Sequence, residues 1–140
     1  MVSIRGLGIT SDDQLRDLAD AMGIALNYIG FADDIPSDTP LGPNIINLGG
    51  RETYNEGTHW VLWYVSPDMK WSCYFDSFGA PPEDRIVELS PKPLLINQKQ
   101  VQGDAEEFCG IWAITCAAFI DRAKDKKNAL ERFVEYFDSV

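Results

Sequence analysis

The sequence predicts an α+β protein, and three observations support this class. A capped amphipathic segment opens the chain, runs of aromatic and β-branched residues fill its middle, and apolar segments with helical periodicity close it. Helices at both ends with strands between them are typical of α+β folds. The length of 140 residues suits one hydrophobic core, so we expect a single domain over residues 1–140.

The N-terminal part predicts one helix and two short strands. Ser11 and Gln14 form an S-x-x-Q capping box, and apolar residues then recur on one face, which predicts a helix over about 12–22. Gly23 is well placed to end that helix. The following residues predict a strand, a loop rich in Asp, Pro and Ser, and a second strand, over 24–31, 33–43 and 45–48.

The middle of the chain gives the strongest strand signal. Two aromatic and β-branched runs are joined by a four-residue loop and predict a hairpin, with strands over 58–65 and 70–75. The predicted register pairs Val65 with Lys70. Carried along both strands, it places His59 opposite Asp76, about 5 Å apart and within reach of a hydrogen bond. A slip of one residue would put the two side chains on opposite faces.

The C-terminal half predicts three helices and one strand. A short helix with Pro at its start is expected over 81–88, and a strand over 94–96. An apolar helix should run from Cys109 to residue 123 or 124. The last helix should begin at Asn128, where N-x-x-E is a cap signal and an apolar stripe follows.

The loop that leads into the apolar helix is the first candidate for chemistry. Cys109 stands at the first turn, where unpaired N–H groups and the helix dipole favour a thiolate. Gln102, seven residues earlier, carries an amide that could donate a hydrogen bond into the same space. A nucleophile and a donor for developing negative charge form half of an acyl-transfer site. The alternative is that Cys109 is a small core residue.

His59 is the only histidine, so it is the only candidate for an imidazole base. A histidine in an apolar strand can instead be a core residue, and Asp76 can be a turn-forming residue that bonds its own backbone. A histidine, a carboxylate opposite it, and an amide and thiol on one loop favour catalysis when taken together.

Composition excludes several classes of function. The net charge of −10 argues against binding to DNA, RNA or an anionic membrane. Three cysteines without C-x-x-C spacing fit reduced thiols, with Cys73 and Cys116 in the core, and predict neither disulfides nor a metal site. We expect no cofactor. No leader and no apolar run of membrane-spanning length is found, so we expect a soluble, intracellular protein.

Four blocks of sequence, in order, resemble the adenovirus endopeptidase (adenain) family of cysteine proteases. The order His, acid, Gln, Cys and the seven-residue step from Gln to Cys are those of the family. The blocks are NLGGRET at 47–53, GTHW at 57–60, YFDSFG at 74–79, and VQG at 101–103 with CG at 109–110. The resemblance implies a papain-like or adenain-like fold. In that fold a central mixed sheet is flanked by helices, and the nucleophile stands at a helix N-terminus.

The resemblance also implies roles for residues. Cys109 would be the nucleophile, His59 the base, Asp76 the residue that orients it, and Gln102 an oxyanion donor. Trp60 would roof a groove that admits glycine-like residues, although core packing is an equal alternative. Asp76 stands where adenovirus enzymes usually have glutamate, and either carboxylate can orient a histidine.

A biological setting follows from the resemblance alone. It implies a viral endopeptidase, from a DNA virus such as a virophage, that cleaves Gly-containing sites in capsid precursor polypeptides during virion maturation. The implied place of action is the virion and the infected host cell. Residues 77–101 contain no cysteine, so an activating peptide, if one is used, would bind without a disulfide.

Two other functions remain open at this point. The stretch 75–77 is also similar to that of cellular deSUMOylating enzymes, so an isopeptidase for a ubiquitin-like modifier is the first alternative. The second is a non-catalytic binding protein that keeps the fold.

Overall fold

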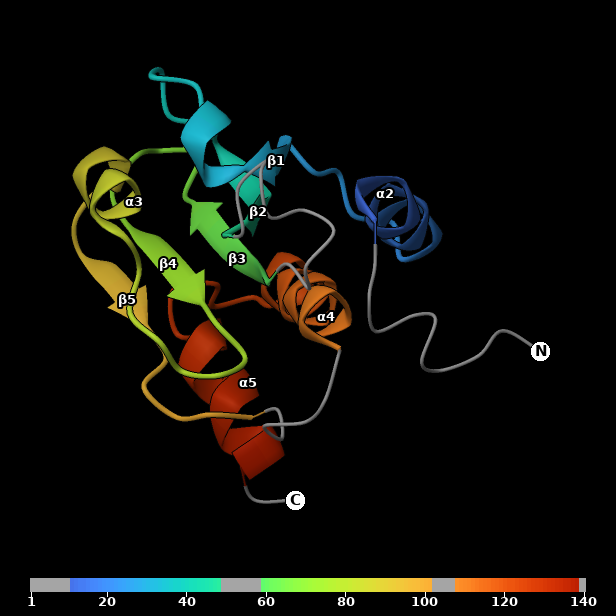
Figure 1. The fold of residues 1–140 in the computed structure, drawn as a ribbon. Coiled ribbons are helices and arrows are strands. Elements are labelled where there is room, and N and C mark those ends of the chain that lie inside the picture. Colours follow the sequence, from blue (N-terminus) through green and yellow to red (C-terminus); the bar gives the residue numbers. More distant parts are fainter. Residues whose placement is uncertain (1–10, 49–58, 102–107, 139–140) are drawn as a thin grey trace.

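A computed structural model describes residues 11–48, 59–101 and 108–138. In these residues a five-stranded sheet lies between two layers of helix (Figure 1). The strands are β1 (Tyr28–Phe31), β2 (Gly42–Asn47), β3 (Trp60–Val65), β4 (Ser72–Phe75) and β5 (Leu94–Ile96). The helices are α2 (Asp12–Ala21), the 3-10 helix η1 (Ala32–Asp34), α3 (Asp84–Leu89), α4 (Cys109–Arg122) and α5 (Ala129–Asp138). The predicted α+β class is confirmed.

The sheet is mixed, with strand order β1-β2-β3-β4-β5. The two outer pairs, β1 with β2 and β4 with β5, are parallel, whereas β3 runs antiparallel to both of its neighbours, β2 and β4. The central strand β3 is buried along its whole length. Its residues therefore read as one continuous apolar run, because both faces of the sheet are covered.

The predicted β3–β4 hairpin is present, but its predicted register was wrong by two residues. Val65 pairs with Ser72 and not with Lys70. The cause is the side chain of Ser66, whose Oγ accepts hydrogen bonds from the backbone N–H groups of Lys70 and Trp71, both at 3.1 Å. These bonds draw both residues into the turn, so β4 begins later than the aromatic pattern suggests. A shift of two residues keeps every side chain on its predicted face.

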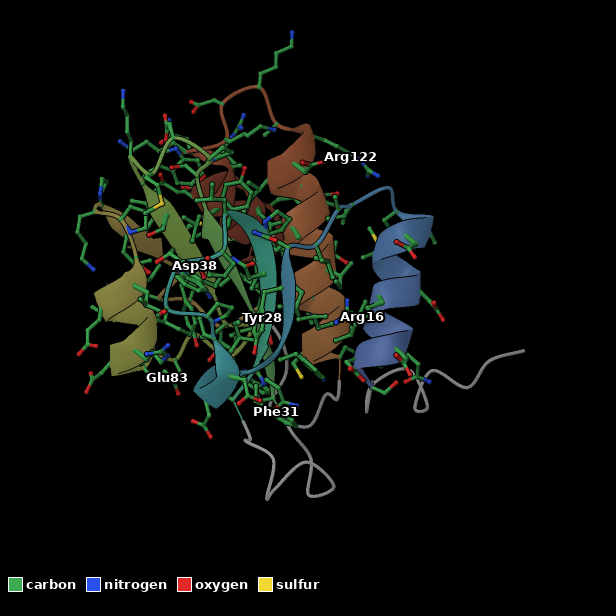
Figure 2. The ribbon with its side chains drawn as sticks, turned by 90° about the horizontal axis from the view of Figure 1, so that it is seen from above. Arg16, Tyr28, Phe31, Asp38, Glu83 and Arg122 are labelled. Carbon is green, nitrogen blue, oxygen red and sulfur yellow. The ribbon has the colours of Figure 1, made fainter. Side chains whose placement is uncertain are left out.

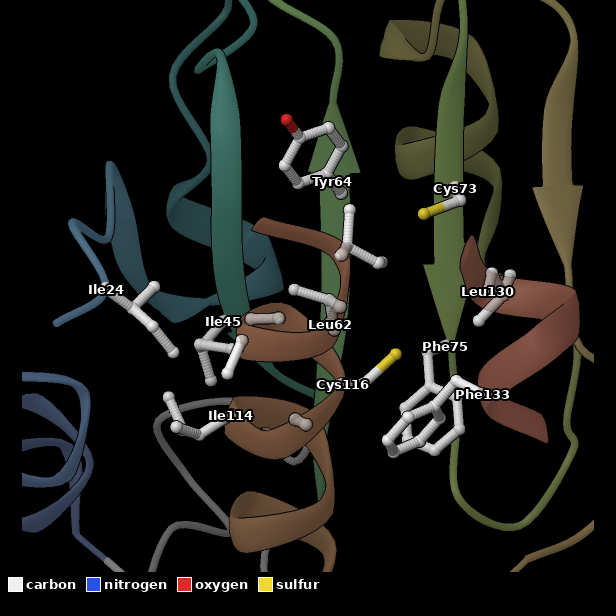
Figure 3. Close-up of a cluster of buried hydrophobic side chains, with 14 of the residues drawn as sticks. Ile24, Ile45, Leu62, Tyr64, Cys73, Phe75, Ile114, Cys116, Leu130 and Phe133 are labelled. Carbon is white, nitrogen blue, oxygen red and sulfur yellow. The ribbon is translucent and has the colours of Figure 1, made fainter. Parts of the chain in front are cut away.

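One face of the sheet carries the larger core, to which α2, α4 and α5 contribute. The helix α4 is apolar on all sides, which suits its place against β2 and β3 with α2 and α5 packed on it. Figure 3 shows Cys73 of β4 and Cys116 of α4 with their sulfur atoms directed into this core. The expectation that these two cysteines are core residues is confirmed, since both are completely buried.

The opposite face carries a smaller core beneath η1 and α3. The alternating residues Val61, Trp63 and Val65 of β3 point to this side, where Ile86 of α3 packs against the sheet. The indole N–H of Trp63 donates to Ser90 Oγ at 2.9 Å, so the one buried polar atom of that large side chain is satisfied. Both faces of the β3–β4 hairpin are therefore held by packing. The end of the hairpin opposite its turn is thus fixed in position and can carry a functional site.

The predicted start and end of α2 follow local rules closely. In α2 the Gln14 N–H donates to Ser11 Oγ at 3.2 Å and the Ser11 N–H to Gln14 Oε1 at 3.0 Å, which confirms the capping box. Gly23 ends this helix with φ of +72°. The strand expected over 24–31 is shorter, since β1 starts at Tyr28, and the short helix α3 begins later than residue 81. The strand over 94–96 is found as predicted.

Candidate active site

The open end of the β3–β4 hairpin brings an imidazole and a carboxylate together. His59 directly precedes β3 and Asp76 directly follows β4, so the antiparallel pairing puts both at the same end. His59 Nε2 lies 2.6 Å from Asp76 Oδ1. The predicted contact is therefore present despite the register error, because the two-residue shift preserved the shared face.

Asp76 is held from three directions. Its side chain is 2% exposed, and Oδ1 also accepts a hydrogen bond from the Phe78 N–H at 2.8 Å. Its backbone N–H donates to Asn97 Oδ1 at 2.9 Å, and Asn97 Nδ2 donates back to the Asp76 carbonyl at 2.7 Å. Asp76 is thus both the turn-forming residue and the histidine's partner, so the two sequence interpretations were not exclusive.

Cys109 is the first residue of α4, where it meets the start of β3. The backbone N–H of Trp60, the residue that follows His59, donates to Cys109 Sγ at 3.4 Å, and the negative charge of Cys109 is one of the causes that raise the pKa of His59. Since Nε2 of His59 faces Asp76, Nδ1 is the ring nitrogen left for the thiol. Hydrogen-bond donors and a helix N-terminus both stabilise negative charge on sulfur.

Gly110 lets other elements approach the nucleophile closely. A Cβ at this position would lie 2.9 Å from Leu15 Cδ2 of α2 and 3.4 Å from Trp60 Cδ1. The missing side chain therefore allows α2 and the indole to pack against the first turn of α4. This explains physically why glycine stands after cysteine in the CG block.

The electrostatics of His59 favour its charged form. Burial alone lowers the pKa of His59. The hydrogen bonds and negative charges of Asp76 and Cys109 outweigh that effect and raise the pKa from 6.5 to about 9. The ring also stacks on Phe78, with centroids 4.9 Å apart and planes at 28°. His59 is therefore expected to be an imidazolium at neutral pH, held in one orientation beside Cys109.

The predicted oxyanion donor, Gln102, lies outside the described residues. The chain just before it is anchored to the turn that holds the acid, because the Val101 N–H donates to the Ser77 carbonyl at 2.9 Å. Gly79, with φ of +77°, lies against the backbone of Gln98, whose carbonyl would be 3.0 Å from an added Cβ. The segment that leads to Gln102 therefore packs against the turn that follows Asp76.

Trp60 packs in the core, and its proposed role at a substrate groove stays a prediction. Its side chain is 2% exposed and belongs to the larger core, which fits the packing alternative. It also lines a cavity of about 280 Å³ together with Asp12, Gly30 and Phe31. Core packing and a role at the edge of a groove are therefore compatible for this side chain.

Sequence reasoning missed Asn97, which follows β5 and binds both backbone polar groups of Asp76. Asn97 is 6% exposed, and Nδ2 also donates to the Lys99 carbonyl at 3.0 Å. A polar residue directly after a strand is common, so the sequence carried no signal for this role. Phe78 was part of the YFDSFG block, but its stacking on the imidazole was not anticipated.

Comparisons with known proteins do not assign this chain to a family. A scan against protein-family models gives no match, and a search among curated proteins finds no significant similarity. Within the described parts of the chain, no group of three or more His, Cys, Asp or Glu side chains could hold a metal ion. Across those same parts, no helix combines the length and apolarity needed to cross a bilayer.

Proposed function

We propose that the chain is a cysteine peptidase of the papain-like or adenain-like type, with Cys109 as nucleophile, His59 as base and Asp76 as orienting acid. The observation that carries this proposal is the placement of one imidazole between a buried carboxylate, 2.6 Å away, and a thiol at the N-terminus of α4. The same three groups in the same relation activate thiols for acyl transfer.

The proposed reaction starts from the imidazolium–thiolate pair. The Cys109 sulfur attacks a peptide carbonyl and forms a tetrahedral intermediate. His59 then gives its proton to the leaving amine, and the C–N bond breaks to leave an acyl-enzyme. Neutral His59 next removes a proton from water, which attacks the thioester and releases the acid. Asp76 keeps Nε2–H engaged throughout, so Nδ1 always faces the reacting atoms.

Negative charge on the carbonyl oxygen needs donors near the start of α4. The N–H groups in the first turn of a helix point towards its N-terminal end, and the Cys109 N–H is the proposed first donor. Gln102 is the proposed second donor, on the basis of sequence spacing. Removing one oxyanion donor typically raises the barrier by about 3 kcal/mol.

The proposed substrates are capsid or other virion precursor polypeptides cleaved at Gly-containing sites, in the virion or the infected cell. This part of the proposal is supported by the sequence blocks that resemble adenain and by the place of Trp60 beside the nucleophile. An activating peptide would bind without a disulfide. The described cysteines other than Cys109 are buried and so could not form one on the surface.

Covalent labelling tests the catalytic assignment directly. The protein is incubated with a Gly-Gly vinyl-sulfone probe, and the adduct is mapped by mass spectrometry. We expect a single stoichiometric adduct at Cys109 that is lost in His59→Ala. Cys116→Ala is the matched control, since it removes a thiol from the same helix and should leave labelling intact. No adduct on the folded wild-type protein would refute the assignment.

The substrate class is tested separately from the chemistry. Purified capsid precursors and conjugates of ubiquitin-like modifiers are incubated with the wild-type protein and with Cys109→Ala. Cleavage of capsid precursors by the wild type alone is expected. Turnover of modifier conjugates alone would replace the proposal with an isopeptidase, for which the stretch 75–77 is the only specific indication. No turnover and no labelling would favour a non-catalytic binding protein.

A further inference from the structure

A cavity of about 280 Å³ opens beside the candidate active site. Its described lining residues come from three elements: Asp12 starts α2, Gly30 and Phe31 end β1, and Trp60 starts β3. Trp60 directly follows His59, and its backbone N–H binds the Cys109 sulfur. The cavity and the candidate nucleophile therefore share Trp60 as a neighbour.

The aromatic side of the cavity is held in place by β1. The Tyr28 hydroxyl donates to the Phe31 carbonyl at 2.8 Å, and the phenol lies over Gly30, where an added Cβ would be 2.8 Å from Tyr28 Oη. Figure 2 shows Tyr28 and Phe31 along this strand. Gly30 thus permits the bond that fixes the backbone of Phe31, while the indole of Trp60 is fixed in the core. Both aromatic residues of the lining are therefore held in fixed positions.

The lining also contains a carboxylate. The capping box of Ser11 and Gln14 sets the start of α2, and Asp12 is the first residue of that helix. Asp12 Oδ1 accepts the Asp13 N–H at 3.0 Å, which orients the carboxylate, and the side chain is only partly exposed. The described lining of the cavity contains this carboxylate and two aromatic rings but no cationic group.

A cavity lined by a carboxylate and aromatic residues is complementary to an organic cation. Ammonium and guanidinium groups bind to ring faces and form charge-assisted hydrogen bonds with carboxylates. An apolar side chain in this space would displace water from the carboxylate of Asp12 without offering a hydrogen bond in its place, and an acidic one would be repelled. The net charge of −10 adds a field that attracts cationic segments.

We propose that this cavity is a substrate subsite for a lysine or arginine side chain near the scissile bond, with Asp12 as the residue that selects it. This inference rests on the proposed peptidase function and adds the class of substrate to it. Asp12 supplies the charge, and the partly exposed Phe31 supplies aromatic surface for the alkyl stem and charged head of the side chain, while Trp60, only 2% exposed, completes the lining.

Quenched fluorogenic peptides with a central Gly-Gly test the subsite. Each flanking position is occupied in turn by Lys, Gln or Glu, and kcat/KM is measured for each peptide. We expect one position at which Lys exceeds Gln about tenfold and exceeds Glu by more. Asp12→Asn should bring the Lys-to-Gln ratio at that position close to one, and Asp12→Lys should make Glu the preferred residue. Phe31→Leu should reduce the ratio in part.

Asp13→Asn is the matched control, because it removes the same charge from the next, exposed residue of α2, which does not line the cavity. It should keep both the ratio and kcat/KM. Turnover without preference for Lys at any position, or a preference that survives Asp12→Asn, overturns the subsite and leaves the peptidase proposal standing. Absence of both turnover and vinyl-sulfone labelling overturns the peptidase proposal, and the subsite with it.

Discussion

Cys109 and the pair Cys73 and Cys116 are three thiols in the same core cluster with different surroundings. Burial hardly distinguishes them, since Cys109 is 6% exposed and the other two are fully buried. Burial raises the pKa of Cys73 to about 12 and raises the pKa of Cys116 well above its usual range. Cys109 instead meets a backbone N–H and an imidazole at the first turn of a helix.

The difference teaches that position relative to a helix end decides what a buried thiol can do. Cys116 lies two turns further along the same helix, where the backbone N–H groups are already bonded and the neighbours are apolar. Moving seven residues along α4 therefore changes a candidate nucleophile into a small core residue. Each prediction below tests one part of this contrast.

The largest effect is expected from exchanging the two thiols of α4 for alanine. Cys109→Ala should lower peptide hydrolysis about a thousandfold or more, because the nucleophile is lost, with little change in stability. Cys116→Ala should keep kcat/KM per folded molecule but lower the free energy of unfolding by about 1–3 kcal/mol, because it leaves a void in the core. Hydrolysis assays measure kcat/KM, and urea denaturation measures the free energy of unfolding. Equal loss of activity in the two variants would contradict the contrast.

Reactivity towards iodoacetamide should separate the three thiols in the folded protein. We expect Cys109 to be alkylated roughly a thousandfold faster than Cys73 or Cys116, because the thiolate is the reacting species and the core thiols are both neutral and covered. Peptide mapping over a time course measures the rates. In denaturant all three should react alike, which controls for intrinsic reactivity, and rapid labelling of Cys116 in the folded state would refute the assignment.

Removing the carboxylate of Asp76 should reduce the difference in reactivity between Cys109 and the core thiols, although the Cys109 thiol itself is kept. Asp76→Asn should lower kcat/KM by about a hundredfold, since neither the charge nor the tautomer of His59 is then fixed. It should also move the basic limb of the pH–rate profile from near pH 9 towards the ordinary histidine pKa of 6.5. Asp68→Asn, at the exposed turn of the same hairpin, removes an equal charge and should leave both quantities unchanged.

The raised pKa of His59 also predicts how the stability of the folded protein depends on pH. The pKa of His59 is raised on folding to about 9, so its protonated form stabilises the folded state. That contribution is fully present below pH 6.5 and is lost as pH rises through about 9. The free energy of unfolding of wild type minus that of His59→Gln should therefore decline over this window. Urea denaturation at several pH values measures it, and a difference that grows with pH would contradict the raised pKa.

The sequence predicted those parts of the fold and site that depend on local patterns. The capping box of α2, the strand β5 and the start of α4 follow from short-range rules, and the face shared by His59 and Asp76 follows from strand periodicity. The hairpin register did not follow, because one serine side chain, that of Ser66, reorganised the turn. Predicted strand lengths failed where non-local pairing decides the ends, as in β1.

The role of Asn97 could not be predicted, because it depends on two strands that are adjacent only in the folded sheet. Asn97 follows β5, and its parallel pairing with β4 brings the amide to the backbone of Asp76, 21 residues earlier in the chain. No local pattern marks such a contact. The pattern of aromatic residues likewise predicted strands without indicating that Phe78 stacks on His59.

The smallest effect is expected from replacing Asn97, which binds the backbone of Asp76 and so affects the reactivity of Cys109 only indirectly. Asn97→Ala removes both hydrogen bonds to the Asp76 backbone, so it should lower the free energy of unfolding by about 1–3 kcal/mol and kcat/KM roughly tenfold. Asn44→Ala is the matched control. Asn44 is also buried and donates to the Pro40 carbonyl at 2.9 Å, but it lies in β2, away from the hairpin end.

Both asparagine variants should therefore lose stability, and only Asn97→Ala should lose activity per folded molecule and alkylate more slowly at Cys109. The reason is that Asp76 would keep its side chain but lose the fixed backbone from which it holds His59 Nε2. If the two variants lowered kcat/KM equally, the effect would come from general loosening of the sheet. The contrast between Cys109 and the core thiols would then rest on the helix end and the imidazole alone.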